Sequence, residues 1–473
     1  MANRRALISV SDKTGLLEVA RALLDAGYEI VASDGTAATL RDSGLATKTI
    51  EEITGSPEIL DGRVKSLHPA IHGAILFDRE DPQQIKEAEA NGLTAIDIVI
   101  VNLYPADKFD IGGPALIRAA AKNHRAVSVI TAPEQYPELI ESLAKGSDPV
   151  QRKNWAAVAI DRTTRYDLAI LADFSRPLRY GENPHQNGKV FGSAGLASGE
   201  LIQGSELSFN NYLDGDSATR LANEFDEPTA VIVKHGIPVG VAINAHPAKA
   251  VIGALSGDPL SAFGGVLATN FEISGEVAQE LEEKFLELLI APAISKEARL
   301  ILAKRTKLRI FCVKRIEDQF EFRMINGGLL FQNSDQLKGS NDQPENWRLV
   351  SGPAVDAGKL ADLHFAWKIA ARCRSNSIVI AHDQVALGIG AGQVNRLAAA
   401  ELAIARAGDR SIGSVAASDG FFPFADGITS LIKAGVIAVV SPGGSIRDEE
   451  VIAAATAANL SLYFTGIRHF SHN

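Results

Sequence analysis

The sequence predicts an α/β protein that is divided into at least two domains. A chain of 473 residues is too long to fold around a single hydrophobic core. Up to Phe174, strand and helix patterns alternate, which is typical of a parallel sheet covered by helices. Beyond that point the chain mixes both patterns with different glycine- and proline-containing turns, so a second domain is expected there. The apolar content of 46% and the charged content of 22% are ordinary for globular domains.

Hydrophobic periodicity assigns the elements of the first domain. Continuous apolar runs predict four buried strands, over Ala6–Val10, Tyr28–Ala32, Ile96–Leu103 and Val127–Thr131. Between the first two strands a helix is expected that ends at Gly27, with an apolar face made by Leu16, Leu17, Ala20, Leu23 and Leu24. Two further helices are expected, over Pro114–Lys122, where proline suits the first turn, and over Gln151–Phe174.

The bulk composition narrows the class of protein. The two cysteines, Cys312 and Cys373, cannot form a disulfide framework, which favours a reducing cytoplasm. The first apolar stretch is too short for a signal peptide, and no run of about 18 apolar residues predicts a membrane span. The net charge of −10 disfavours general nucleic-acid binding, which depends on neutralising phosphates. An anionic substrate would therefore need a local concentration of positive charge.

Two loops that follow predicted strands have the composition of anion sites. Their candidate ligands are Ser11 and Lys13 in the first loop, and Ser33, Gly35 and Thr36 in the second. Hydroxyl groups and the free N–H groups of a helix start can surround a phosphate, and Lys13 adds a charge. One such loop would more simply cap its helix. Because two of them follow adjacent parallel strands, where ligands of α/β sheets bind, both interpretations stay open.

A polar stretch over 62–69 gathers cationic side chains, a hydroxyl group and an imidazole, and it includes Lys65, Ser66 and His68. A solvated loop is the simpler interpretation. His68 and His72 have a spacing known from metal sites, but Pro69 interrupts a helix through both. No acidic or thiol ligand lies beside them in the sequence, so no metal site is predicted.

Three residues of the first domain could carry acid–base chemistry. Tyr104 follows a buried strand, Asp110 comes shortly after, and Lys122 ends the next helix. Together with a second lysine they could orient an amide, transfer protons and stabilise a developing oxyanion. Each of them alone is more often an ordinary surface residue.

In the second domain, Lys234 and His235 follow an apolar run and precede a glycine–proline turn. Such a pair could act in proton transfer, although an isolated Lys–His pair usually has no catalytic role. Asn376, Arg396 and Arg468 could bind an anionic ligand, although arginine pairs are commonly structural.

Glycines also suggest a dinucleotide-binding turn. The segment Gly388–Gly392, GIGAG, follows a strand but lacks the third spaced glycine and the βαβ unit with its terminal acid. We therefore do not expect NAD binding. No GxxxxGK[ST] loop is present, so ATP use is not indicated.

Several longer motifs together resemble one family, the bifunctional proteins of purine biosynthesis that join an AICAR transformylase (phosphoribosylaminoimidazolecarboxamide formyltransferase) to an IMP cyclohydrolase. The motifs occur in the order of that family from Ser9 to the last residue: SVSDKTG, GRVKSLHP, FDIGGPALIRAAAKNH, LRYGENPHQ, DPLSAFGGV, RSNSIV, GIGAGQVNR, SDGFFPFAD and TGIRHFSHN. The resemblance covers essentially the whole chain.

This resemblance implies a fold and its boundaries. It implies a methylglyoxal-synthase-like cyclohydrolase domain over residues 1–172 and a transformylase domain over residues 173–473. The latter would consist of two cytidine-deaminase-like subdomains, approximately 173–340 and 341–473, with the polar stretch Gln332–Asn346 as the candidate linker. The zinc-ligand pattern HxE…PCxxC of working deaminases does not occur, so this fold is expected to need no metal.

The resemblance also implies roles for individual residues. The cyclohydrolase residues correspond to Lys65, Ser66, Tyr104, Asp110 and Lys122, and the nucleotide-phosphate loops to Ser11, Lys13, Ser33, Gly35 and Thr36. The transformylase catalytic pair corresponds to Lys234 and His235. Substrate contacts correspond to Arg179, Tyr180, Asn376, Arg396, Phe421 and Arg468, and a folate contact to Asp426.

The implied chemistry has two steps. A formyl group passes from 10-formyltetrahydrofolate to AICAR, and the product FAICAR then loses water and closes to IMP. AICAR, FAICAR, IMP and folate would be the ligands, a homodimer the assembly, and neither nucleic acid nor membrane a partner.

Departures from the family leave alternatives open. The loop between Tyr104 and Asp110 is shorter than the family usually has, and Ser66 stands where threonine is usual. A transformylase with an impaired cyclohydrolase is therefore one alternative. A folate- or nucleotide-binding protein without turnover is another, but it would not need the lysines, tyrosine, aspartate and histidine that transfer protons.

Overall fold

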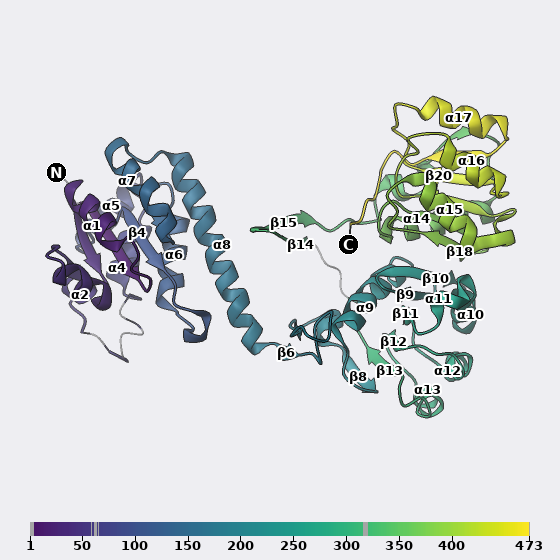
Figure 1. The fold of residues 1–473 in the computed structure, drawn as a ribbon, viewed down its shortest axis with the longest axis horizontal. Helices are drawn as coiled ribbons and strands as arrows, with labels where there is room; N and C mark the ends of the chain where they lie inside the picture. Colours follow the sequence, from purple (N-terminus) through teal and green to yellow (C-terminus); the bar gives the residue numbers. More distant parts are fainter. Residues whose placement is uncertain (1–3, 58, 61–63, 65, 316–319, 473) are drawn as a thin grey trace. The chain divides into compact units, whose positions relative to one another are not determined.

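The computed structural model describes residues 4–57, 59–60, 64, 66–315 and 320–472 (Figure 1). The chain forms two compact units, Met1–Ser175 and Arg176–Asn473. Each unit has hydrophobic cores of its own. Within the described residues, no helix is both long enough and apolar enough to cross a membrane.

The first unit is built on a five-stranded sheet in the order β3-β2-β1-β4-β5. All pairings are parallel. The strands are β1 (Arg4–Val10), β2 (Tyr28–Ala32), β3 (Lys48–Thr49), β4 (Ile98–Asn102) and β5 (Ser128–Ile130). The four strands expected from apolar runs are therefore present, because a parallel strand covered on both faces is apolar along its length.

Helices surround this sheet. They are α1 (Leu16–Asp25), α2 (Asp34–Asp42), α3 (Ile50–Thr54), α4 (Pro69–Leu76), α5 (Pro82–Ala90), α6 (Gly112–Lys122), α7 (Tyr136–Lys145) and α8 (Pro149–Phe174). Helix α1 buries Leu16, Val19, Ala20 and Leu23 on one face, as its periodicity predicts. Helix α6 begins two residues earlier than expected, at Gly112, and α8 begins at Pro149, capped by the Asp148 side chain.

The second unit is built on one mixed sheet of twelve strands. Its order is β16-β21-β20-β19-β17-β18-β10-β9-β11-β12-β13-β8. The strands are β8 (Glu200–Gln203), β9 (Thr229–Lys234), β10 (Ile237–Ile243), β11 (Val266–Thr269), β12 (Leu288–Ala291), β13 (Arg309–Cys312), β16 (Arg348–Ser351), β17 (Ile378–His382), β18 (Val385–Gly390), β19 (Val415–Ser418), β20 (Ala438–Ser441) and β21 (Ser461–Phe464). Two short strands, β6 (Arg176–Pro177) and β7 (Lys189–Val190), pair separately.

The twelve strands divide into two halves with the same topology. In each half an antiparallel hairpin is followed by three strands that are parallel to one another. The outermost strand of each half, β8 or β16, is antiparallel to its neighbour. The hairpins β9–β10 and β17–β18 meet where β10 pairs with β18 at Ala242 and Val385. The helices repeat in the same order: α9 (Phe209–Ala222), α10 (Pro247–Gly257), α11 (Pro259–Ala262), α12 (Gly275–Leu281) and α13 (Lys296–Leu302), then α14 (Ala357–Arg372), α15 (Arg396–Ala407), α16 (Asp426–Lys433) and α17 (Asp448–Ala457).

The glycines of GIGAG serve the packing of the second half. A side chain on Gly388 or Gly390 would overlap the backbone of α15, at the carbonyl groups of Ala403 and Ala399. In the first half, Gly240 of β10 faces Ala254 of α10 in the same way. These glycines therefore allow a helix to lie directly on its strand, which explains the motif without a dinucleotide.

The polar stretch Gln332–Asn346, expected as a linker, lies in the sequence between the strands of the two halves. Its first residues end strand β15 (Gly328–Asn333), which pairs with β14 (Phe320–Ile325) in a separate hairpin. Asp342 is fully buried and accepts hydrogen bonds from Trp367 (Nε1, 3.2 Å) and the His469 ring (Nε2, 2.8 Å). Asp342 is thus a partner within the fold, because a buried carboxylate requires donors.

Candidate active site

In the first unit the candidate residues follow the carboxyl ends of parallel strands, which lie at one edge of the sheet. Ser11 follows β1, Ser33 follows β2, and Tyr104 follows β4. The backbone N–H (2.6 Å) and the hydroxyl group (3.0 Å) of Ser11 both donate to the side-chain oxygen of Asn102, at the end of β4. This edge is where α/β folds bind ligands.

Lys13 joins the two loops that could bind a phosphate. Its ammonium donates to the carbonyl of Gly35 (2.5 Å) and to the hydroxyl of Thr39 (2.8 Å), both on α2. Thr36 is buried and its hydroxyl bonds the backbone of Val10. The two loops therefore form one continuous surface, with a lysine charge at the start of α2.

Ser66 and Asp110 meet at the start of helix α6. A Cβ atom on Gly112 would overlap the hydroxyl of Ser66, and one on Gly113 would overlap the carboxyl of Asp110. That carboxyl accepts the backbone N–H of Gly113 (Oδ1, 3.1 Å), and the backbone N–H of Asp110 donates to the hydroxyl of Tyr166 (2.7 Å) on α8. The two glycines thus leave room for a hydroxyl and a carboxylate at a helix N-terminus.

The structure brings only part of the predicted cyclohydrolase set together. Tyr104 follows β4 at the same edge and is 53% exposed. Lys122 is exposed at the opposite end of α6, about 15 Å from its first residue at 1.5 Å rise per residue. Lys65 lies outside the described residues. Beyond the motifs, the structure adds Asn102 and Tyr166 as residues that hold the loops.

His68 and His72 have other partners than a metal. His68 is the N-cap of α4, and its Nδ1 atom accepts the backbone N–H of Ala70 at 3.1 Å. Burial lowers the pKa of His72, and a hydrogen bond to the Ser66 backbone opposes this shift. His68 thus serves the start of α4, whereas the Nε2 atom of His72 is buried without a hydrogen-bond partner among the described residues.

In the second unit, strand directions bring the candidate residues of both halves to one edge of the sheet. Strand β9 is antiparallel to β10, β10 to β18, β18 to β17, and β17 to β19. Strands β9, β18, β19, β20 and β21 therefore run in one direction and end at the same edge. The residues at this edge are Lys234 and His235 after β9, Asn376 before β17, Phe421 after β19 and Arg468 after β21.

Lys234 ends strand β9, and His235 and Gly236 form the turn of the β9–β10 hairpin. His235 has a φ of 55° and Gly236 a φ of 72°, so both are left-handed. The carboxyl of Asp214, on α9, accepts the backbone N–H groups of His235 (3.2 Å) and Gly236 (2.6 Å). The Lys234 ammonium donates to the carbonyl of Phe263 at 2.8 Å, and the imidazole is exposed.

A loop between β6 and β7 carries Arg179 and Tyr180. The Arg179 guanidinium lies 4.8 Å from the centre of the Tyr180 ring, and its NH2 group donates to the Tyr180 hydroxyl at 3.0 Å. The loop is tied to α9, because the Asn210 amide donates to the carbonyl of Glu182 at 3.2 Å. It therefore lies at the helix that also carries Asp214.

Arg396 is buried and organises the second half of this edge. Its guanidinium pairs with the fully buried Asp419 and donates to the side-chain oxygen of Asn376 at 2.9 Å. The Asn376 amide in turn donates to the carbonyl of Gln393 at 2.8 Å. The Arg396 charge is thus neutralised within the protein by Asp419. Arg396 therefore positions Asn376 and does not present a free cation to a ligand.

Three further candidates are at least partly accessible to solvent. Arg468 is exposed, with its guanidinium 4.7 Å from the centre of the Phe470 ring. Phe421 is half-buried after β19, and Asp426 is exposed at the start of α16. These side chains can present a cation, an aromatic face and a carboxylate to a ligand.

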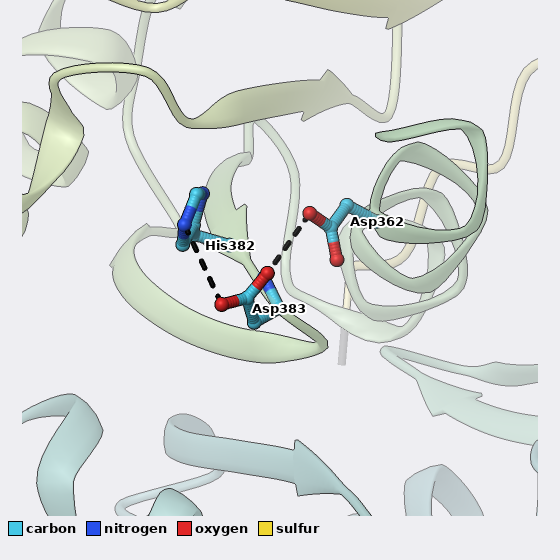
Figure 2. Close-up of side chains that lie close together, drawn as sticks. All are labelled: Asp362, His382 and Asp383. Carbon is cyan, nitrogen blue, oxygen red and sulfur yellow. Dashed lines mark hydrogen bonds and ion pairs between the residues drawn. The ribbon is translucent and has the colours of Figure 1, made fainter. Parts of the chain in front are cut away.

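One group among the described residues has the spacing of metal ligands, and it is formed by Asp362, His382 and Asp383 (Figure 2). Their ligand atoms lie within 4.8 Å of one another. The Asp362 carboxyl, however, accepts the backbone N–H groups of Asp383 (3.1 Å) and Gln384 (2.7 Å). The Lys359 ammonium lies 2.7 Å from the His382 ring and 3.3 Å from Asp362. The positive charge of the Lys359 side chain thus already lies beside these groups, and the Asp362 carboxyl serves to hold the turn at Asp383 and Gln384.

Comparison with known proteins identifies the family. A family model described as "AICARFT/IMPCHase bienzyme" matches residues 120–406, and one described as "MGS-like domain" matches residues 15–130. The chain belongs to the AICARFT/IMPCHase bienzyme family. As a member it is a bifunctional enzyme that combines AICAR formyltransferase and IMP cyclohydrolase activities.

Curated relatives match the chain over nearly its whole length. Three of them are named "Bifunctional purine biosynthesis protein PurH". The protein from Mycobacterium marinum is 43% identical, over 99% of this chain and 98% of the relative. The protein from Cutibacterium acnes is also 43% identical, over 99% of both chains. A solved structure titled "Crystal structure of ForH" is 32% identical with a TM-score of 0.34, over 36% of this chain and 97% of that chain.

The resemblance drawn from the motifs and the α/β class of both parts are thereby confirmed. Members of this bienzyme family use a formyl-folate cosubstrate. Sequence motifs did not single out Asp214 or Asp419. Asp419 lies inside the motif SDGFFPFAD, but only the structure shows that it pairs with Arg396. Asp214 is 21 residues from His235, and no short pattern signals that contact.

Proposed function

We propose that the second unit transfers the formyl group of 10-formyltetrahydrofolate to AICAR and that the first unit closes FAICAR to IMP. The observation that carries the first part is the position of the half-buried Lys234 and the exposed His235, at the sheet edge where Asn376, Phe421 and Arg468 also lie. The second part is supported by the meeting of Ser66 and Asp110 at the start of α6, beside the loops of Ser11 and Ser33.

In formyl transfer, the difficulty is a weakly basic amine. The 5-amino group of AICAR shares its electrons with the imidazole ring and the carboxamide, so it attacks a formyl carbon poorly. His235 accepts the proton of the attacking nitrogen as the new N–C bond forms. Lys234 donates a proton to the folate nitrogen as its bond to the formyl carbon breaks. Asn376, Arg468 and the Arg179–Tyr180 stack bind AICAR, while Phe421 contacts AICAR and Asp426 the folate.

In ring closure, the carboxamide nitrogen of FAICAR attacks the formyl carbon, and water leaves. Ser11, Lys13, Ser33, Gly35 and Thr36 bind the phosphate at the start of α2. Asp110 and Tyr104 transfer protons, Ser66 orients the substrate, and Lys65 stabilises the developing oxyanion. The geometry of α6 does not support the role predicted for Lys122 in ring closure. If a Lys122→Ala variant cyclises FAICAR at the full rate, Lys122 is not part of the site.

We further propose that the enzyme acts as a homodimer. Hairpin β14–β15 exposes apolar side chains that share one of its faces, namely Phe320, Phe322, Met324 and Phe331. The ring centres of Phe322 and Phe331 lie 5.1 Å apart, with the two rings tilted by 45°. A contiguous exposed apolar patch of this kind marks an association surface, and a second copy of the chain is the partner that the family resemblance implies.

The decisive experiment incubates the purified chain with AICAR and 10-formyltetrahydrofolate and measures tetrahydrofolate and IMP separately. Both products are expected. A His235→Ala variant should form neither from AICAR, yet should still convert supplied FAICAR to IMP. Equal loss of both reactions in that variant would contradict two separate sites.

An enzyme with full formyl transfer but impaired ring closure is the second candidate. It is favoured by the loop between Tyr104 and Asp110, which is shorter than the family usually has. Cyclisation of supplied FAICAR distinguishes the two candidates, because the second predicts tetrahydrofolate formation with little IMP.

A further inference from the structure

The hairpin turn that carries Lys234 and His235 is held from outside the hairpin. Each oxygen of the Asp214 carboxyl accepts one backbone N–H, from His235 (Oδ2, 3.2 Å) and from Gly236 (Oδ1, 2.6 Å). His235 is a non-glycine residue with a φ of 55°, a conformation that such residues rarely adopt without support. The carboxylate supplies that support, because charge-assisted hydrogen bonds to two successive N–H groups fix the turn.

The helix that carries Asp214 is itself fixed against the sheet. A Cβ atom on the neighbouring Gly215 would lie 2.7 Å from the side chain of Ile290 on β12. Helix α9 therefore lies directly on the strands, and Asp214 is half-buried. Through Asp214, the position of the turn is thus fixed relative to the sheet.

The second half of the unit contains the same arrangement. Asp362, on α14, accepts the backbone N–H groups of Asp383 (3.1 Å) and Gln384 (2.7 Å), whose φ values are 48° and 55° (Figure 2). Helix α14 and hairpin β17–β18 occupy the places of α9 and β9–β10 in the repeated topology. The same carboxylate clasp therefore occurs twice, but only one of the two turns carries the Lys–His pair.

We infer that Asp214 is a positioning residue for formyl transfer, which fixes the backbone of His235 and thereby the direction of its imidazole. This inference rests on the proposed role of Lys234 and His235. Asp214 has no contact with substrate in this scheme and acts through the turn alone. A displaced imidazole would reach the AICAR amine less often in the geometry for proton transfer, so turnover rather than binding depends on the clasp.

The test compares Asp214→Asn with Asp362→Asn in the full chain. Asparagine keeps the shape of the side chain, but its amide nitrogen cannot accept an N–H, so one of the two bonds is lost. For Asp214→Asn we expect kcat of formyl transfer to fall on the order of 100-fold, with KM for AICAR unchanged. For Asp362→Asn we expect Tm to fall by about as much as in Asp214→Asn. Its kcat should be unchanged, because its turn carries no catalytic pair.

Amide hydrogen exchange provides a readout that does not depend on activity. In the parent protein the N–H groups of His235 and Gly236 should be protected, and in Asp214→Asn they should exchange faster. The N–H groups of Asp383 and Gln384 should change only in Asp362→Asn.

Failure of the inference and failure of the proposed function are distinguishable with His235→Ala. If His235→Ala still transfers formyl groups, the proposed function of the turn is wrong. If His235→Ala is inactive while Asp214→Asn keeps parent kcat, Asp214 is not a positioning residue. Equal losses of kcat in Asp214→Asn and Asp362→Asn would also overturn the inference, because they would report general destabilisation.

Discussion

At the scale of single residues, His469 connects the C-terminal segment to the interior of the second unit. Burial alone would lower the pKa of His469, but hydrogen bonds to Asp335 and Asp342 and their charges raise it to about 9. The charged imidazole therefore stabilises the folded protein fully below its ordinary pKa of 6.5, and this contribution is lost as pH rises through about 9.

The raised pKa of His469 predicts how the stability of a His469→Gln variant depends on pH. Its Tm should lie well below that of the parent at pH 6, because Asp342 then lacks its charged partner. The difference in Tm should narrow as pH approaches 10, where the parent has lost the same charge. Thermal unfolding at several pH values measures it, and a difference that stays constant with pH would show that His469 is not charged in the fold.

Tyr166 provides a second test at this scale, in the first unit. Its hydroxyl accepts the backbone N–H of Asp110 at 2.7 Å and so ties the short loop after Tyr104 to α8. Tyr166→Phe should lower cyclisation of FAICAR, cost about 1 kcal/mol of stability, and leave formyl transfer intact. Tyr136→Phe is the matched control, because the Tyr136 hydroxyl is buried without a partner and its removal should cost nothing. If both variants cyclise FAICAR at the parent rate, the tether is not needed.

At the scale of elements, hairpin β14–β15 carries the prediction of a dimer. Phe322 is 69% and Phe331 is 60% exposed, and a charge on either should prevent association. We expect sedimentation to show a dimer for the parent and a monomer for Phe322→Asp. Leu300→Asp is the control, since Leu300 on α13 is 76% exposed but lies outside the hairpin. A monomeric parent protein, or a dimer that persists in Phe322→Asp, would contradict the proposal.

Sequence patterns predicted the elements of the first unit because local chemistry determines them. Apolar runs identified β1, β2, β4 and β5, and periodicity identified α1. Tertiary partners decided the rest. The stretch Gln332–Asn346 has a polar composition, yet Asp342 is buried because His469, 127 residues away, supplies a donor. The positions of Ser66 and Asp110 at the start of α6 likewise depend on Gly112 and Gly113, whose missing side chains make the space.

At the scale of the whole molecule, the repeat in the second unit was expected only from the family resemblance, which implies two cytidine-deaminase-like subdomains. No short segment of the first half recurs in the second, although α9-β9-β10-α10 and α14-β17-β18-α15 have one topology. Topology depends on where apolar faces and turns occur, and many sequences satisfy it. The motifs identified the candidate residues, but the strand directions were needed to show that Lys234 and Arg468 share a sheet edge.

Because the two units have separate cores, each is expected to fold and to be active by itself. The core of the first unit is formed by residues between Ala6 and Ala159, and the cores of the second begin at Leu207, with no residue in common. Each unit buries its own apolar surface and should fold alone. Residues 1–175, produced separately, should convert FAICAR to IMP, and residues 176–473 should form tetrahydrofolate from AICAR and 10-formyltetrahydrofolate. A mixture of both should restore IMP formation from AICAR, because FAICAR can diffuse between them. If the intact chain makes IMP while the mixture of folded, individually active parts does not, the two sites must be coupled through the covalent connection at Ser175.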